Sequence, residues 1–173
     1  VGEVYFVVDG HHRVSVAREQ GQEFIEAEVR ECATRINITP DIKPEDLEIL
    51  GAKVDFLERT GLDKLRPDAN IKLNIPDGFT RMLEHISVHR YFMGLDFKRN
   101  ISEKEAVGHW YDTVYLPIVT LIRKSGLLED FPDKTEGDLY LWTLDHQHYL
   151  YQEEGQPLQP PEKAARQFIE ENE

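Results

Sequence analysis

The sequence has little cysteine, few basic residues and no long apolar run. Cys32 is the only cysteine among 173 residues, which excludes an intrachain disulfide and a zinc site built from several cysteines. No apolar run is long enough to cross a bilayer, and the chain does not open with a charged segment followed by an apolar one, as a signal peptide does. We therefore expect a soluble, cytoplasmic protein without a membrane partner.

The charge balance excludes another class of partner. Lys and Arg number 20 against 33 Asp and Glu, which gives a formal net charge of −13. Broad attachment to nucleic acid needs a basic stripe, so we do not expect a nucleic-acid partner. Any phosphate site must be a local basic island. Hydrophobic residues make up 40% of the chain, which is enough for a globular core.

The strongest local pattern lies near the N-terminus. Residues 4–8 are apolar, β-branched or aromatic, as in a buried strand, and they are followed by Asp9 and Gly10. A helix is predicted from His11 to Gln20, with Gly21 after its end. Gly10 permits the dihedral angles of a tight turn between the two elements.

Two interpretations of this corner are open. A plain strand-to-helix connection would need only the glycine. However, the helix begins with His11, His12 and Arg13, and positive groups at a helix N-terminus oppose the helix dipole unless an anion compensates them. The free N–H groups of the first turn are suited to such an anion. We favour a phosphate or nucleotide site over a purely structural corner.

The motif Asp9-Gly10-His11-His12-Arg13 resembles the phosphate-binding loop of the ParB/sulfiredoxin superfamily, in the variant seen in free-serine kinases. The resemblance covers about residues 3–31. It implies that Gly10, His11, His12 and Arg13 contact nucleotide phosphates and that Asp9 lies at the mouth of the loop. We expect ATP or ADP as the nucleotide, and Mg²⁺ beside it because phosphoryl transfer usually needs a cation to offset phosphate charge.

The chain departs from two branches of that superfamily. Sulfiredoxins have their reactive cysteine where this chain has His11, so that chemistry is excluded. ParB proteins have Glu-Arg-Arg after the glycine, which speaks against DNA partition with CTP. In the superfamily a segment before the signature strand supplies further nucleotide contacts. We therefore expect that an N-terminal part of the native protein is missing from this sequence.

The predicted fold class is α+β, with a small mixed sheet like that of ParB and sulfiredoxin followed by a mainly helical region. The strands are expected at residues 4–8, 24–29 and 35–39, and one more at 71–75. The expected domains are 1–43, 44–155 and 156–173, the last a proline-rich spacer with a terminal helix. Residues 48–154 resemble the helical extension of bacterial proteins that carry a ParB-like domain, and the resemblance rests on residues 109–117 and 131–142.

Further helices are predicted from capping signals and turn residues. We expect helices at residues 44–60 and 79–93, the second ending at Gly94. Capping boxes begin at Ser102 and Thr135 and predict helices to about residues 124 and 154. Pro117 must kink or divide the first of these two helices.

His85 and His89 lie one turn apart on the predicted helix 79–93, a spacing that can chelate a metal. A third ligand is not evident, although His109, Asp145, His146 or His148 could supply one. Hydrogen-bonded histidines within a helical bundle are the simpler interpretation, and we favour it. Most of the aromatic residues between 110 and 151 are expected to pack in the core; a base-stacking platform is the less favoured alternative, because it normally comes with a basic groove.

These observations lead to two functional hypotheses. In the first, the protein is a phosphotransferase or nucleotide hydrolase in which Asp9 is the candidate catalytic base or Mg²⁺ ligand. In the second, it is a non-catalytic regulatory module in which a bound nucleotide alters how the helical region meets a protein partner. The sequence does not fix the oligomeric state.

Overall fold

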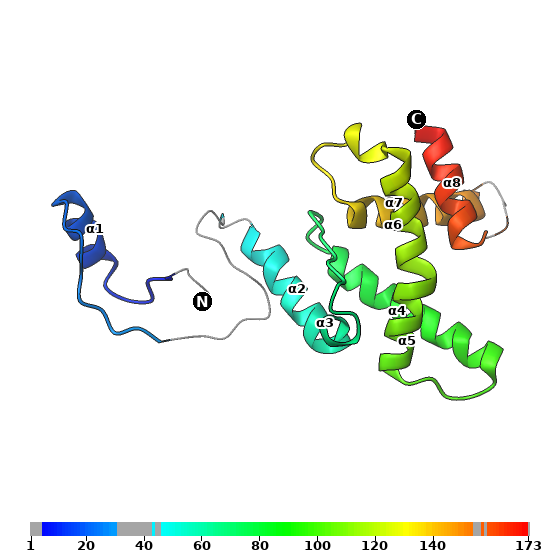
Figure 1. Cartoon of the computed structure of the whole chain (residues 1–173), viewed down its shortest axis with the longest axis horizontal. Coiled ribbons are helices and arrows are strands. Elements are labelled where there is room, and N and C mark those ends of the chain that lie inside the picture. Colours follow the sequence, from blue (N-terminus) through cyan, green and yellow to red (C-terminus); the bar gives the residue numbers. More distant parts are fainter. Residues whose placement is uncertain (1–4, 31–42, 44–45, 154–156, 158, 173) are drawn as a thin grey trace. The chain divides into compact units, whose positions relative to one another are not determined.

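The computed structural model describes residues 5–30, 43, 46–153, 157 and 159–172. The chain separates into two compact units, Val1–Leu47 and Glu48–Glu173. Within the described residues every regular element is a helix and none is a strand (Figure 1). The predicted α+β fold, with its mixed sheet like that of sulfiredoxin, is therefore wrong. The domain boundaries predicted after residues 43 and 155 stay predictions.

The first unit contains a single helix within its described residues, α1 (His11–Glu19). It begins at His11 as predicted and ends one residue before the predicted end, and it lies between two glycines in the left-handed region, Gly10 at φ 84° and Gly21 at φ 66°. Ala17 is the one buried residue among those described in this unit. The unit therefore has little core of its own within the part of the chain that is described.

The strands predicted on either side of α1 are not formed. Residues 5–8 and 24–29 have no strand ladder, and Val8 and Phe24 are 92% and 87% exposed. β-branched and aromatic residues favour a strand only when a neighbouring strand accepts their main-chain hydrogen bonds and covers one face. No described segment does so here. Residues 4 and 35–39, also predicted as strand, lie outside the described residues.

The second unit is a bundle of helices. Its elements in chain order are α2 (Asp46–Thr60, which begins two residues before the unit), α3 (Leu62–Leu65), α4 (Gly78–Phe97), α5 (Glu103–Trp110), the π-helical turn η1 (Tyr111–Tyr115), α6 (Leu116–Ser125), the 3₁₀ turn η2 (Leu127–Glu129), α7 (Glu136–Glu153) and α8 (Pro161–Asn172). In Figure 1, α6 continues the line of α5, and α7 and α8 lie near its upper part.

Apolar side chains from α2 and α4–α8 meet in one core. Trp110 and Tyr140 lie in it at 1% and 0% exposure, and the indole N–H of Trp110 donates a hydrogen bond of 3.1 Å to the hydroxyl of Tyr140. Other members of this core are Phe56, Phe79, Met82, Ile118, Ile122, Leu139, Leu141 and Phe168. Burial of these side chains is the main stabilising contribution to the unit.

Both predicted capping boxes are present. The hydroxyl of Ser102 accepts a hydrogen bond of 3.3 Å from the N–H of Glu105 at the start of α5. At the start of α7, Thr135 accepts from the N–H of Asp138 at 3.1 Å, and the Asp138 carboxylate accepts from the N–H of Thr135 at 2.8 Å. Each pair satisfies main-chain donors that have no partner within the helix.

Pro117 divides the predicted helix of residues 102–124, as expected. Proline has no N–H for the carbonyl four residues before it, so the α-helical pattern cannot continue unchanged through this point. The chain forms the π-turn η1 directly before it, and the N–H of Leu116 donates to the carbonyl of Tyr111. α6 then begins with its proline in the first turn, where the missing N–H costs nothing.

Two other predictions in this unit are wrong. The helix α4 does not stop at Gly94 but continues to Phe97 and ends at Lys98, which has a positive φ of 52°. Residues 71–75 are not a strand. Ile71 and Leu73 are buried and alternate with exposed residues, but they pack against the bundle, and the segment bonds to side chains of α7 and its cap.

Among the described residues, no helix combines the length and apolar character that crossing a membrane requires.

Candidate functional site

The corner of residues 9–13 begins α1. Gly10 is the N-cap residue, with φ 84° and ψ 24°, a conformation that residues with a Cβ adopt only with strain. The Asp9 carboxylate accepts a hydrogen bond of 2.7 Å from the N–H of Gly10. The N–H of Val14 donates to the carbonyl of Gly10 at 3.1 Å and closes the first turn. The glycine therefore sets the direction in which the helix starts.

The first turn of α1 presents donors without partners. The N–H groups of His11, His12 and Arg13 have no acceptor among the described residues, and no side chain caps this end of the helix. The first turn also contains no acidic residue. All three side chains are exposed. The helix dipole adds partial positive charge at the same point, so the turn is suited to an anion.

The Arg13 side chain lies close to the corner. Its Nη2 atom donates a hydrogen bond of 3.2 Å to the carbonyl of Glu26. A Cβ atom placed on Gly10 would be 4.0 Å from both Nε and Nη2 of Arg13. The guanidinium group therefore lies near the glycine, and Nε and Nη1 have no bonded partner among the described residues. This arrangement puts a fixed positive charge next to the free N–H groups.

The corner has residues that can bind a nucleotide phosphate and Mg²⁺. Three main-chain N–H groups and a guanidinium can donate to phosphate oxygens. One Asp9 oxygen is bonded to Gly10, and its other oxygen can still accept. Mg²⁺ in nucleotide sites is commonly held by one or two carboxylates together with phosphate oxygens and water, so the single carboxylate of Asp9 fits that use.

His85 and His89 face different partners. His85 Nδ1 lies 3.3 Å from the hydroxyl of Tyr140, and His89 Nε2 lies 2.8 Å from Nδ1 of His109. Burial lowers the pKa of both imidazoles; the Arg81 cation adds to this for His85, and the His109 ring adds to it for His89. Neutral rings are thereby favoured, as hydrogen bonding within the bundle requires.

Two of the other ligands considered for a metal have ionic partners of their own. Asp145 forms an ion pair with Arg81, and His146 Nε2 lies 2.6 Å from a Glu171 carboxylate oxygen. No group of three or more His, Cys, Asp and Glu side chains in the described part of the chain is placed to hold a metal ion. The pair His89–His109 alone offers two nitrogens.

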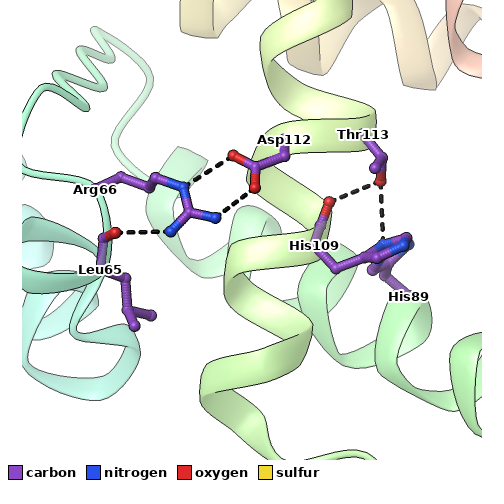
Figure 2. A network of polar contacts seen from close by, with 6 residues as sticks. All are labelled: Leu65, Arg66, His89, His109, Asp112 and Thr113. Carbon is purple, nitrogen blue, oxygen red and sulfur yellow. Dashed lines mark hydrogen bonds and ion pairs between the residues drawn. The ribbon is translucent and has the colours of Figure 1, made fainter.

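A second polar network surrounds the π-turn (Figure 2). Arg66, from the segment after α3, donates from Nε to one Asp112 oxygen at 2.9 Å and from Nη2 to the other, and its Nη1 donates to the carbonyl of Leu65 at 2.7 Å. The Arg66 guanidinium lowers the pKa of Asp112. On the other side of the turn, Thr113 donates to the carbonyl of His109 at 2.7 Å.

The π-turn also lines a pocket of about 440 Å³. Tyr111 and Tyr115 are stacked in its wall with ring centres 5.6 Å apart, and Arg123 and Glu136 form a two-point ion pair at 2.7 and 2.6 Å. π-turns within helices are often found at functional sites. The other residues that line the pocket are Arg66, Pro67, Asp68, Ala69, Asn70, Asp112, Leu116 and Val119.

Tyr115 is the notable group in this pocket. Its side chain is 5% exposed, yet its hydroxyl has no hydrogen-bond partner among the described residues. Burial, together with the Glu136 carboxylate, raises its pKa, so the hydroxyl keeps its proton. The Tyr115 hydroxyl therefore offers the pocket a neutral donor suited to an acceptor atom of a small polar molecule.

Sequence reasoning did not find this pocket. Arg66 and Asp112 are 46 residues apart, and no local pattern joins them. The one available signal was Pro117, because a proline inside a predicted helix indicates a rearranged turn before it. The tyrosines at positions 111 and 115 share that turn, but a stacked pair at this spacing is equally typical of core packing.

Comparison of the chain with protein-family models, with curated proteins and with solved structures finds no match. The resemblance of residues 3–31 to the ParB/sulfiredoxin superfamily thus stays a hypothesis that depends on the motif of residues 9–13.

Proposed function

We propose that the corner of residues 9–13 binds the phosphate groups of a nucleotide, ATP or ADP, together with Mg²⁺. The observation that carries this proposal is the first turn of α1, where three N–H groups lack acceptors among the described residues. The Arg13 guanidinium lies close to the same turn. An anion is the ligand that satisfies these donors and the helix dipole together.

The residues of the corner have different roles in this proposal. Arg13 and the main-chain N–H groups neutralise phosphate charge, and His11 and His12 add further donors at the rim. Asp9 accepts from Gly10 with one oxygen and offers the other to Mg²⁺. When bound, Mg²⁺ offsets phosphate charge and so favours phosphoryl transfer. In the catalytic form of the proposal, Asp9 is the base or the Mg²⁺ ligand.

Isothermal titration of ATP and of ADP, each with Mg²⁺, into the whole chain tests this proposal. Arg13→Ala should weaken binding at least about tenfold, because a charge-assisted hydrogen bond contributes roughly 1.5–3 kcal/mol. Arg18→Ala is the matched control, since Arg18 lies in the last turn of the same helix and its loss changes the net charge equally. Equal affinities for the two variants would contradict the assignment.

Two further titrations separate phosphate recognition from other causes. Inorganic pyrophosphate with Mg²⁺ should compete with ATP, because the proposed contacts are to phosphate oxygens. Gly10→Ala should also weaken binding, because alanine at φ 84° is strained and alters the start of the helix. If pyrophosphate does not compete, the nucleotide is bound elsewhere.

Release of phosphate from bound ATP distinguishes the enzyme from the regulatory module. Turnover that is lost in Asp9→Asn, with ATP still bound, supports the phosphotransferase or hydrolase hypothesis. Binding without turnover supports the non-catalytic hypothesis, in which the nucleotide alters how the helical unit meets a protein partner.

A further inference from the structure

The C-terminal half of α4 has an exposed apolar surface, which we call the α4 stripe. It consists of Val88, Tyr91, Phe92 and Leu95, which are 56%, 64%, 56% and 55% exposed. Their spacing of three, four and seven residues places them on one face of the helix. In the view of Figure 1, this end of α4, in bright green, extends beyond α5.

The opposite face of the same helix is already buried. Phe79, Met82, Ile86 and Met93 are at most 7% exposed and pack within the unit. α4 is therefore apolar on two faces, of which the described part of the chain covers one. A helix that is apolar all round is normally covered on both sides, and an exposed patch of this kind often marks an interaction site.

Opposite charges lie at the two ends of the stripe. Glu84 precedes it and Lys98 follows it, and both are exposed. Neither has an ion-pair partner within the part of the chain that the structure describes. The three nearby arginines, by contrast, are paired: Arg81 with Asp145, Arg90 with Glu103, and Arg99 with Glu105.

We propose that the α4 stripe packs antiparallel against the α4 stripe of a second copy of this chain. A two-fold axis between Tyr91 and Phe92 places Val88 opposite Leu95 of the second copy. The same axis places Glu84 level with residue 99 of the second copy, one residue from Lys98, so the two opposite charges lie next to each other twice in each dimer. At 100° per residue Glu84 lies on the Tyr91 edge of the stripe, and Lys98 lines the hollow beside Tyr91, so the two-fold operation brings the two charges to the same side.

The surface beside the stripe fits this arrangement. A hollow of about 510 Å³ lies along the Tyr91 edge, and its lining includes Ser87, Gly94 and Lys98. A two-fold axis makes the Tyr91 edge of one copy face the Tyr91 edge of the second copy. Tyr91 of the second copy therefore approaches this hollow. Small side chains next to large ones allow the interdigitation that helix pairs require.

Sedimentation velocity of the whole chain over a wide concentration range tests the dimer. The exposed apolar patch is of modest area, so we expect a Kd on the order of micromolar and not a permanent dimer. Tyr91→Gln should weaken dimerisation at least about tenfold, as for an aromatic residue at the centre of an interface. Tyr149→Gln is the matched control, since Tyr149 is 55% exposed on α7. Circular dichroism checks that both variants fold.

The charge pair gives a sharper test. Glu84→Lys and Lys98→Glu should each remove the dimer, because like charges then face each other twice. An equimolar mixture of the two variants should dimerise again, since every facing pair in the heterodimer is attractive. A parallel arrangement or a dimer through another surface would not show this rescue.

Three results would overturn the proposal. The first is a chain that stays monomeric at every concentration. The second is a dimer that survives Tyr91→Gln, which would place the contact elsewhere, for example on the exposed apolar residues of the first unit. The third is failure of the mixed variants to associate although the unchanged chain does. None of these outcomes depends on nucleotide binding at residues 9–13.

Discussion

His89 and His109 share a single hydrogen bond between their rings, with Nε2 of His89 2.8 Å from Nδ1 of His109. Only one proton can lie between these two nitrogens, so one ring donates and the other accepts. The ring centres are 5.0 Å apart. A second proton on the facing nitrogens would break the hydrogen bond and place two positive charges side by side.

This pair predicts that stability depends on pH. Burial, and next the His109 ring, lower the pKa of His89 in the folded state, and burial also lowers that of His85. The unfolded chain therefore binds more protons than the folded chain just below the ordinary histidine pKa of about 6.5. Stability should fall as the pH is lowered from 7 to 5. Urea unfolding followed by circular dichroism measures it.

The fall in the urea midpoint should be smaller in His89→Gln, because glutamine does not titrate in this range. His148→Gln provides the control, since His148 is exposed on α7. If His89→Gln and the unchanged chain lose the same stability between pH 7 and 5, His89 is not the group that responds.

Two buried tyrosines give a matched test of hydrogen bonding. Their rings are 5.0 Å apart, but only Tyr140 has hydrogen-bond partners in the described structure. Tyr140→Phe leaves the buried N–H of Trp110 without an acceptor and should cost about 1–3 kcal/mol. Tyr115→Phe removes a hydroxyl that has no partner and should change stability little. Equal losses for the two variants in urea unfolding would contradict this difference.

The capping signals in the sequence predicted helix starts well, because their hydrogen bonds join residues only three apart. Thr135 and Asp138 fix the start of α7 by contacts that the local sequence fully specifies. The same two residues also bond to the segment before α4. The Asp138 carboxylate accepts from the N–H of Asn74 at 2.9 Å, and Thr135 donates to the carbonyl of Lys72 at 2.7 Å.

Those bonds explain why the strand at residues 71–75 was predicted wrongly. The alternation of buried and exposed residues is real, as Ile71 and Leu73 show. A strand, however, also needs a neighbouring strand to pair with its main chain. Here the main chain of the segment bonds instead to side chains of α7 and of the residue just before it. The alternation therefore indicated that one side of the segment is buried. It did not indicate which groups the main chain of the segment bonds to.

The candidate sites differ in how far apart their residues lie in the sequence. The corner of residues 9–13 is contiguous in sequence, so its residues could be named in advance. The pocket at the π-turn joins Arg66 to Asp112 and Arg123 to Glu136, and these contacts depend on the packing of the bundle. The α4 stripe could not be predicted from the sequence, because α4 is apolar on two faces and periodicity alone does not say which face the unit covers.

Two glycines inside helices allow the packing of this bundle to be tested. A Cβ on Gly137, in the first turn of α7, would lie 2.4 Å from the carbonyl oxygen of Lys72 and 2.9 Å from Leu73 Cδ2. The first contact is with main chain, which cannot move without displacing the segment that bonds to Thr135 and Asp138. Gly51, in α2, has nothing within 4 Å of such a Cβ.

Glycine to alanine should therefore have opposite effects at these two positions. Gly51→Ala should stabilise the chain by roughly 0.5–1 kcal/mol, because alanine favours the helix and restricts the unfolded chain. Gly137→Ala gains the same helix preference but must push the Lys72 segment away, and we expect a net loss of about 1–3 kcal/mol. Urea midpoints of the two variants measure both changes. A stabilised Gly137→Ala variant would show that α7 does not pack against residues 72–74 as closely as described, and the side-chain bonds from Thr135 and Asp138 would then need to be reassigned.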